Sequence, residues 1–218
     1  LEQNQREIVW LLLHYSVYTS VYFEFSYKIY RKFSQSRILY EHGGIFIWYL
    51  LSCCGRTESD ALALCRRQLP EAVMKDVFVL TYDRMRRYEG AWHMERKALF
   101  PSYVILESED GEALEEAARK YGNIVKQPEC LIRLSREDEK ILRRLCGENR
   151  NLEMSRGIIS KGVARITDGP LKGMESRICR IDRHKRLALV GIVGESPKKK
   201  ARNVPFIFAG LEIMEKTV

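Results

Sequence analysis

Between residues 46 and 146, short apolar runs alternate with segments of helical periodicity. The apolar runs of strand length are residues 47–51, 77–80 and 102–106. The segments with apolar residues at helical spacing are residues 61–69, 111–121 and 136–145. Thr57 and Ser135 each precede an acidic residue by three positions and favour helix starts, whereas Pro70 ends the first helix. This mixture predicts an α+β sandwich built on an antiparallel sheet.

A hairpin is predicted around Gly90, between Arg87 and His93, with its second strand returning through Lys97 to Leu99. The basic residues that flank its tip are Arg84, Arg86, Arg87, Arg96 and Lys97. On a hairpin they could reach a polyanion or a partner protein. Their alternation with apolar residues fits an ordinary solvent face equally well, so both interpretations stay open.

The pattern changes after residue 146. Residues 147–156 are polar, lack periodicity and carry turn-favouring asparagines, which is typical of a flexible linker. From residue 157 to residue 218, short β-rich runs are separated by glycine and proline, with no helical period. This region predicts a small, SH3-like β-barrel, in which closure would remove exposed strand edges.

Residues 1–45 differ from the rest of the chain. They hold six of the eleven tyrosines and lack aspartate and proline. The uncharged stretch at 8–23 falls short of the ~20 apolar residues that a membrane helix needs, and no small-residue cleavage site follows it. We therefore expect an atypical leader, which could reflect a mis-set start, and no stable membrane association.

The formal net charge of +8 is unevenly distributed. Residues 155–218 carry 14 Lys and Arg against 6 Asp and Glu, a net +8, whereas residues 46–154 carry 18 against 19. The excess positive charge therefore points to a polyanionic partner for the C-terminal region alone.

The six cysteines form no CxxC pair and no Cys/His cluster with zinc spacing. They predict reduced, mostly buried thiols in a cytoplasmic protein without metal. The four histidines stand in unrelated contexts, and no nucleophile, paired-carboxylate or phosphate-loop pattern accompanies them. We expect a non-enzymatic protein that needs no cofactor.

The segment at 161–173 carries the clearest motif. Val163 to Ile166 alternates between two faces, Asp168-Gly169 supplies a tight turn, and Pro170 fixes φ as the chain leaves it. The residues that define this turn are Asp168, Gly169, Pro170 and Gly173. Together with the apolar residues at 178–193 and 211–213, the segment closely resembles the KOW motif across nearly the whole C-terminal region.

Trp48-Tyr49 and Phe100-Pro101-Ser102-Tyr103-Val104 add a second resemblance, to the N-terminal domain of the NusG family of transcription factors. This resemblance implies a NusG-type domain at 46–146 and a KOW domain at 157–218. It also implies that the aromatic residues line a hydrophobic concavity that grips a coiled coil of RNA polymerase. The residues that inherit polymerase binding are Trp48, Phe100, Pro101 and Tyr103. The alternative is that the aromatic residues are core residues.

The chain resembles most the specialised, LoaP-like antiterminator branch of that family, through residues 169–174 and 181–188. Basic and polar residues cluster at three of its turns, and such turns can contact phosphates or stack on exposed bases. The residues expected to bind nucleic acid are Lys172, Arg183, His184, Lys185, Arg186, Lys198, Lys199 and Lys200. The alternative is that these turns are only solvated.

Two departures from the family pattern bear on function. Ser176 replaces a common KOW glycine, so we expect an altered or strained turn there. Val193-Gly194-Glu195 stands where general NusG proteins carry Phe-Gly-Arg, which helps to engage Rho or a ribosomal protein. This second departure favours a dedicated antiterminator.

The resemblance therefore implies a monomeric factor that binds RNA polymerase and a nascent RNA hairpin, with upstream DNA as a further candidate partner. Two alternatives stay open. One is a general NusG-like factor that couples polymerase to Rho or the ribosome, and the other is a KOW RNA-binding module that works away from polymerase.

Overall fold

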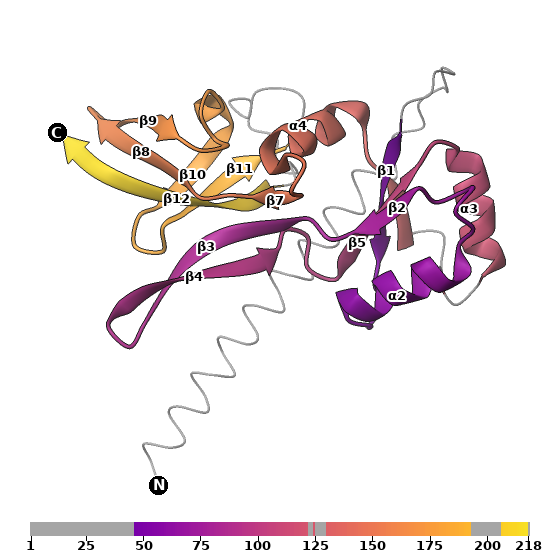
Figure 1. Ribbon diagram of the computed structural model, residues 1–218. Coiled ribbons are helices and arrows are strands. Elements are labelled where there is room, and N and C mark those ends of the chain that lie inside the picture. Colours follow the sequence, from indigo (N-terminus) through magenta and orange to yellow (C-terminus); the bar gives the residue numbers. More distant parts are fainter. Residues whose placement is uncertain (1–45, 122–123, 125–129, 193–205, 218) are drawn as a thin grey trace, which may run out of the picture.

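The computed structural model describes residues 46–121, 124, 130–192 and 206–217. These residues form a mixed α+β structure with three α-helices and three β-sheets (Figure 1). The helices are α2 (Glu58–Gln68), α3 (Gly111–Lys120) and α4 (Arg136–Cys146). The predicted α+β class is confirmed. The expected leader at 1–45 and the cluster Lys198, Lys199 and Lys200 lie outside the described residues, as does the departure at 193–195.

The first sheet has the strand order β2-β5-β1-β6, with antiparallel pairing throughout. Its strands are β1 (Ile47–Ser52), β2 (Asp76–Phe78), β5 (Tyr103–Ser108) and β6 (Leu131–Arg133). Successive residues of a strand point to opposite faces. Trp48 and Leu50 therefore pack in one buried cluster with α4, whereas Tyr49 and Leu51 pack in another with α2 and α3. Figure 1 shows α2 and α3 on one side of this sheet and α4 on the other.

Side chains cap all three helices at the N-terminus. The hydroxyl of Thr57 accepts a hydrogen bond from the Asp60 backbone N–H at 3.1 Å, and that of Ser135 does the same for Asp138 at 3.1 Å. The Asp110 carboxylate accepts from two backbone N–H groups of α3, both at 3.0 Å. Each such cap stabilises a helix by about 1 kcal/mol. The predicted helix starts at Thr57 and Ser135 are confirmed.

The predicted hairpin is also confirmed. Strand β3 (Thr81–Tyr88) pairs with β4 (Ala91–Ala98) in an antiparallel register that ends with Tyr88 opposite Ala91. The two residues between them, Glu89 and Gly90, have φ of 51° and 76°. Positive φ at both positions is the geometry of a type I′ turn, whose twist matches that of the flanking strands.

The prediction of a flexible linker at 147–156 is wrong for its central residues. Asn151 and Leu152 form β7, which pairs in parallel with the start of β3 and makes the sheet order β4-β3-β7. Leu152 is fully buried, and the buried Asn151 amide donates to Asp83 Oδ2 at 2.9 Å. The polar side chain of Asn151 therefore takes part in a buried hydrogen bond. Composition alone does not show whether such a side chain is buried and hydrogen-bonded or exposed to water.

The C-terminal strands form a third sheet in the order β10-β11-β12-β8-β9. Its strands are β8 (Ser155–Ser160), β9 (Val163–Asp168), β10 (Ile178–Asp182), β11 (Leu187–Gly191) and β12 (Phe206–Thr217). The first half of β12 pairs antiparallel with β11, and the second half pairs in parallel with β8. The described strands include no pairing of β9 with β10, so the expected closed barrel is not found among them.

Strand β12 crosses β3 at Gly210. A Cβ at this position would collide with the Asp83 carbonyl oxygen and the Met154 sulfur, so only glycine allows the two strands to approach this closely. Figure 1 shows the β3–β4 hairpin running beside β12. The crossing brings the predicted basic hairpin next to the predicted basic C-terminal turns.

Candidate nucleic-acid interface

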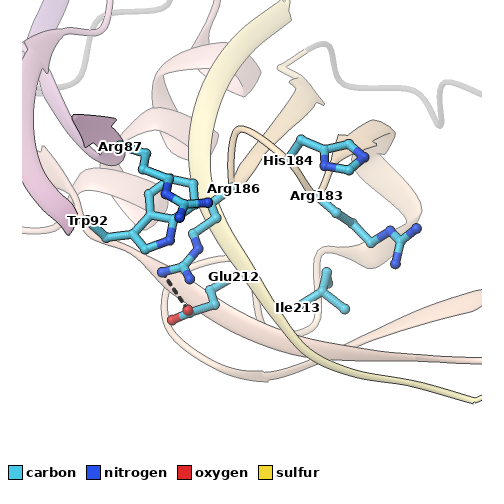
Figure 2. A pocket seen from close by; sticks show the side chains of 7 residues that line it. All are labelled: Arg87, Trp92, Arg183, His184, Arg186, Glu212 and Ile213. Atoms are coloured by element: carbon cyan, nitrogen blue, oxygen red, sulfur yellow. Dashed lines mark ion pairs between the residues drawn. The ribbon is translucent and has the colours of Figure 1, made fainter. Parts of the chain in front are cut away.

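A pocket of about 310 Å³, which we call the junction pocket, lies where the β3–β4 hairpin, the β10–β11 turn and β12 meet. Figure 2 shows the residues that line it, which are Arg87, Trp92, Arg183, His184, Arg186, Glu212 and Ile213. Arg87 and Trp92 face each other across the hairpin register. Arginines and an indole around one recess form a surface suited to planar, anionic ligands.

Arg186 connects the three walls of the pocket. Its guanidinium lies 4.0 Å from the centroid of the Trp92 ring, and its Nη1 lies 2.7 Å from Glu212 Oε1. Figure 2 shows this side chain reaching between the other two. Since Trp92 belongs to β4 and Glu212 to β12, this single side chain joins the hairpin to the C-terminal sheet.

The β10–β11 turn presents its other polar residues to solvent. Arg183, His184 and Lys185 are exposed, and the Lys185 N–H donates to Asp182 Oδ1 at 3.0 Å. Arg186 has φ of 52° at the end of this turn. In the view of Figure 2, Arg183 and His184 lie across β12 from Trp92. The predicted basic tip therefore borders the pocket and continues beyond it.

The pocket has an excess of positive charge. Glu212 is its one carboxylate among the lining residues, and it contacts Arg186 and also Arg156, whose Nε lies 4.0 Å from Oε2. Arg87 and Arg183 form no ion pair within the described part of the chain. Guanidinium groups of this kind attract phosphate, and the release of counterions from the nucleic acid favours the binding.

The hairpin is anchored at its base through Asp83. Arg96 donates to both carboxylate oxygens, at 2.8 and 3.3 Å, and the Asn151 amide donates at 2.9 Å. Burial acts to raise the pKa of Asp83, but the hydrogen bonds from Arg96 and Asn151 and the charge of Arg96 outweigh it and lower the pKa. The ionised carboxylate thus holds β3, β4 and β7 together.

Three further basic residues of the hairpin, Arg84, Arg86 and Lys97, share a second carboxylate. Glu95 lies 3.3 Å from Arg86 and 3.9 Å from both Arg84 and Lys97. The Tyr88 and His93 rings stack beside them at 3.7 Å. Of the five cations predicted to flank the tip, Arg87 alone lines the pocket, while the other four have carboxylate partners within the described residues.

The predicted KOW turn has a structural explanation for each glycine. Gly169 has φ of 92°, and a Cβ there would lie 2.7 Å from the Met154 carbonyl oxygen and from Ser155 Cα. The Ser155 hydroxyl accepts from the Leu171 N–H at 3.1 Å. Gly173 also has positive φ, at 75°. This turn therefore packs tightly on the start of β8.

Other residues of this turn are exposed or differ from expectation. Asp168 and Lys172 are exposed, Pro170 is half-buried, and Lys172 is not among the residues that line the pocket. Ser176 lies in a short 3-10 helix (Glu175–Arg177) and is not among the residues with positive φ, so the expected backbone strain is absent there. A nearby Glu175 oxygen accepts from the Ile166 N–H at 3.1 Å.

The aromatic residues predicted to bind polymerase are buried. Trp48, Phe100 and Tyr103 expose 3%, 2% and 8% of their surface. A polar network encloses Trp48, because its indole N–H donates to Glu107 at 2.9 Å and its backbone N–H donates to Glu139 at 3.1 Å. Arg143 bonds both carboxylates at 2.8 Å and lies 4.1 Å over the indole ring. In this arrangement Trp48, Phe100 and Tyr103 do not line an open concavity.

The Phe100-to-Tyr103 segment forms the turn between β4 and β5. The Tyr103 N–H donates to the Phe100 carbonyl at 3.1 Å, Pro101 occupies the second position, and Ser102 has φ of 65°. These are features of a type II turn. Pro101 is half-buried, so this segment has a structural role whatever it binds.

The cysteines are all free thiols among the described residues. Burial raises the pKa of Cys53 and Cys146 to about 12 and that of Cys65 to about 11. Cys54 and Cys130 are half-buried, with Sγ atoms 3.1 Å apart, and Cys179 is exposed. Within the ranges the structure describes, no three His, Cys, Asp or Glu side chains are grouped as a metal would need, and no helix could span a membrane.

Sequence reasoning did not single out Trp92, Glu212 and Ile213 as lining residues of the pocket, or Gly210 as the point where β12 meets β3. The sequence places Trp92 at the hairpin tip and Glu212 and Ile213 in the closing segment 211–213, whereas Gly210 stands in no motif. No local signal marks them, because each acquires its role from a residue far away in the sequence.

No protein-family model matches the chain, and no curated protein matches it. The comparisons therefore assign neither a family nor a function. Support for a function comes from the geometry of the junction pocket and from the motifs in the sequence.

Proposed function

We propose that this protein is a NusG-type transcription elongation and antitermination factor that acts in the cytoplasm, binding RNA polymerase and nascent RNA. The observation that carries the RNA part is the pocket at the junction of hairpin and turn. It combines three arginines with an indole. The KOW-like turn and the Trp48 and Phe-Pro-Ser-Tyr segments support the polymerase part by resemblance alone.

The chemistry of the C-terminal turn favours RNA as the ligand. Arg183, His184 and Lys185 are exposed at its tip. Arginine binds phosphate through paired N–H groups, and arginine and histidine can both stack on unpaired bases. The charge of residues 155–218 adds a sequence-independent attraction for the RNA backbone.

Polymerase binding through Trp48, Phe100, Pro101 and Tyr103 requires a change in the described arrangement. Helix α4 covers Trp48 through Glu139 and Arg143. A protein partner can bind these aromatic side chains only if the covering elements move, because a buried side chain offers no contact surface. We therefore infer that polymerase binding and the packing around Trp48 compete.

A second candidate is an RNA-binding KOW module that works away from polymerase. The burial of Trp48, Phe100 and Tyr103 favours it, since all three then serve as core residues. Both candidates require RNA binding by the β10–β11 turn. They differ in whether polymerase co-purifies with the protein.

The test of RNA binding uses the full chain with Arg183 and Lys185 both changed to Ser. We expect RNA affinity to fall about tenfold or more and the salt slope to decrease by about 2, one for each phosphate that the variant no longer neutralises. The matched control changes Arg180 and Lys216, also exposed cations of the same sheet, to Ser. Equal losses of RNA affinity in both variants would show that the turn contributes only general electrostatic attraction, and would refute a site there.

The test of polymerase binding is affinity capture of the tagged full chain from cell extract. The variant Glu139→Gln loosens the cover over Trp48, and we expect it to retain more polymerase than the wild type does. A control, Glu115→Gln, removes a carboxylate from an exposed i,i+4 pair on α3. If neither wild type nor variant retains polymerase, the second candidate replaces the first.

A further inference from the structure

We propose that the junction pocket binds a nucleotide of single-stranded RNA, with its base stacked against the pair formed by Trp92 and Arg186. This inference rests on the proposed RNA binding and extends it. The site is then shared by two parts of the chain, because the β3–β4 hairpin supplies Trp92 and Arg87 and the C-terminal sheet supplies the rest.

The dimensions and lining of the pocket fit one nucleotide. A pocket of about 310 Å³ is at the small end of the range for small-molecule sites, close to what one nucleotide fills. Trp92 is half-buried, so part of the indole is held in the protein and part remains accessible. An indole that is fixed in this way is a ready stacking surface for a base.

Arg186 adds a second stacking group, because its guanidinium covers one face of the indole. Its guanidinium already lies against the indole at 4.0 Å, and Glu212 holds it there at 2.7 Å. A guanidinium plane stacks on bases much as an aromatic ring does. Arg186 therefore need not leave Trp92 for a base to bind.

The remaining arginines mark a path for the backbone. Arg87 lies beside Trp92, whereas Arg183 lies across β12 from them in Figure 2. A strand whose base enters the pocket would place one neighbouring phosphate near Arg87 and the next near Arg183. The path thus joins the hairpin to the exposed tip of the β10–β11 turn.

The pocket favours an unpaired strand over a duplex. Bases in an A-form helix are stacked on one another and cannot enter a recess in a protein, whereas bases in loops can be splayed out onto aromatic side chains. A loop or an unpaired end of a nascent transcript therefore fits the site. Duplex RNA would contact only the exposed cations.

The experiment measures binding of a fluorescent single-stranded RNA, about 10 nucleotides long and of mixed sequence, to the full chain. Its duplex form serves as a second probe. We expect Trp92→Ala to weaken single-strand binding about tenfold and to change duplex binding less than about twofold. Trp92→Phe should restore most of the affinity, and quenching of indole fluorescence by RNA should be lost in this variant. Circular dichroism and urea unfolding establish that each variant is folded.

Met94→Ala is the matched control, because Met94 is on the same strand, is 64% exposed and does not line the pocket. It should bind like the wild type. If Trp92→Ala binds single-stranded RNA as the wild type does, while the Arg183 and Lys185 double variant does not, the shared site is refuted and the proposed function stands. If the wild type binds neither probe, RNA binding itself fails. A preference for the duplex would also overturn the single-strand inference.

Discussion

The guanidinium of Arg186 lies 4.0 Å over the Trp92 ring, which joins the turn before β11 to the outer strand of the β3–β4 hairpin. The same guanidinium forms an ion pair with Glu212 of β12 at 2.7 Å. The contact brings together two basic regions that are far apart in the sequence. It also explains how a hairpin in the N-terminal half supplies residues to a pocket formed mainly by the C-terminal half.

Replacing Glu212 with Gln should release Arg186 and add one unit of positive charge to the pocket. Because the pair is partly exposed, we expect the free energy of unfolding to change by less than about 1 kcal/mol. RNA affinity at low salt should rise by about two- to fivefold as the local charge increases. Fluorescence anisotropy over a salt series measures this. An affinity decrease at all salt concentrations would mean that positioning of Arg186 outweighs charge.

Asp83→Asn should destabilise the protein in a pH-dependent manner. The folded-state pKa of Asp83 is lowered, so the folded state binds this proton less readily than the unfolded chain. The stabilisation is therefore present above the ordinary carboxyl pKa of about 4 and is lost as the pH falls through the lower folded value.

At about pH 7 the variant should lose about 1 to 3 kcal/mol, because asparagine has no negative charge and keeps only one acceptor oxygen for the Arg96 guanidinium and the buried Asn151 amide. Urea unfolding at neutral and acidic pH measures both proteins. Their stabilities should converge as the pH falls. If the wild type and the variant instead lose stability in parallel as the pH falls, other carboxylates dominate acid unfolding.

Gly169→Ala should be strongly destabilising. The position has φ of 92°, and a Cβ would lie 2.7 Å from the Met154 carbonyl oxygen and from Ser155 Cα. We expect a loss of about 3 kcal/mol or more in thermal or urea unfolding. Gly162→Ala is the control, since Gly162 has φ of 78° but no atom within 4 Å of a Cβ. It should lose only about 1 kcal/mol, from backbone strain alone. Equal losses of stability in the two variants would show that the destabilisation comes from the positive φ and not from packing.

The buried thiols should resist alkylation in the folded protein. With a pKa of about 12, Cys53 and Cys146 hold a thiolate fraction of roughly one in ten thousand near pH 8. Exposed Cys179 should therefore react first with iodoacetamide. Mass spectrometry of digested samples gives the order. Rapid modification of Cys146 under native conditions would contradict the described packing of α4.

Mild oxidation should join Cys54 to Cys130, whose sulfur atoms are 3.1 Å apart. Hydrogen peroxide would take two electrons and two protons from the two thiols and yield one S–S bond and two waters. The sulfurs need to approach by only about 1 Å. Non-reducing peptide mapping should find the linked peptides, and Cys54→Ser should abolish them. Linkage of Cys130 to another cysteine would contradict the described geometry.

Much of the fold could be predicted because it depends on neighbours in the sequence. The caps at Thr57 and Ser135 satisfy N–H groups within the next three residues, and the Gly90 turn needs positive φ only at two adjacent positions. The apolar run at 47–51 likewise predicts a strand. These signals are local, so sequence reasoning could identify them.

The errors involve pairings between distant segments. Asn151 has the composition of a linker residue, yet it bonds Asp83 and Thr81 in the core of a sheet. The short strands after residue 157 predicted a closed barrel, but the described strands form a sheet whose edge strands, β9 and β10, do not pair with each other. Strand order depends on contacts that residue pattern alone does not specify.

The sequence by itself determined the α+β class, the helix caps, the hairpin, the tight glycine turn after Asp168 and the basic character of the β10–β11 turn. Only the tertiary structure decided that Trp48 and its aromatic partners are buried and that Arg87 and Trp92 join the C-terminal arginines in one pocket. The physical reason is the distance along the sequence over which each interaction acts. Propensity, capping and turn geometry act within a few residues, whereas the burial of an indole and the meeting of distant charges depend on how the strands pack.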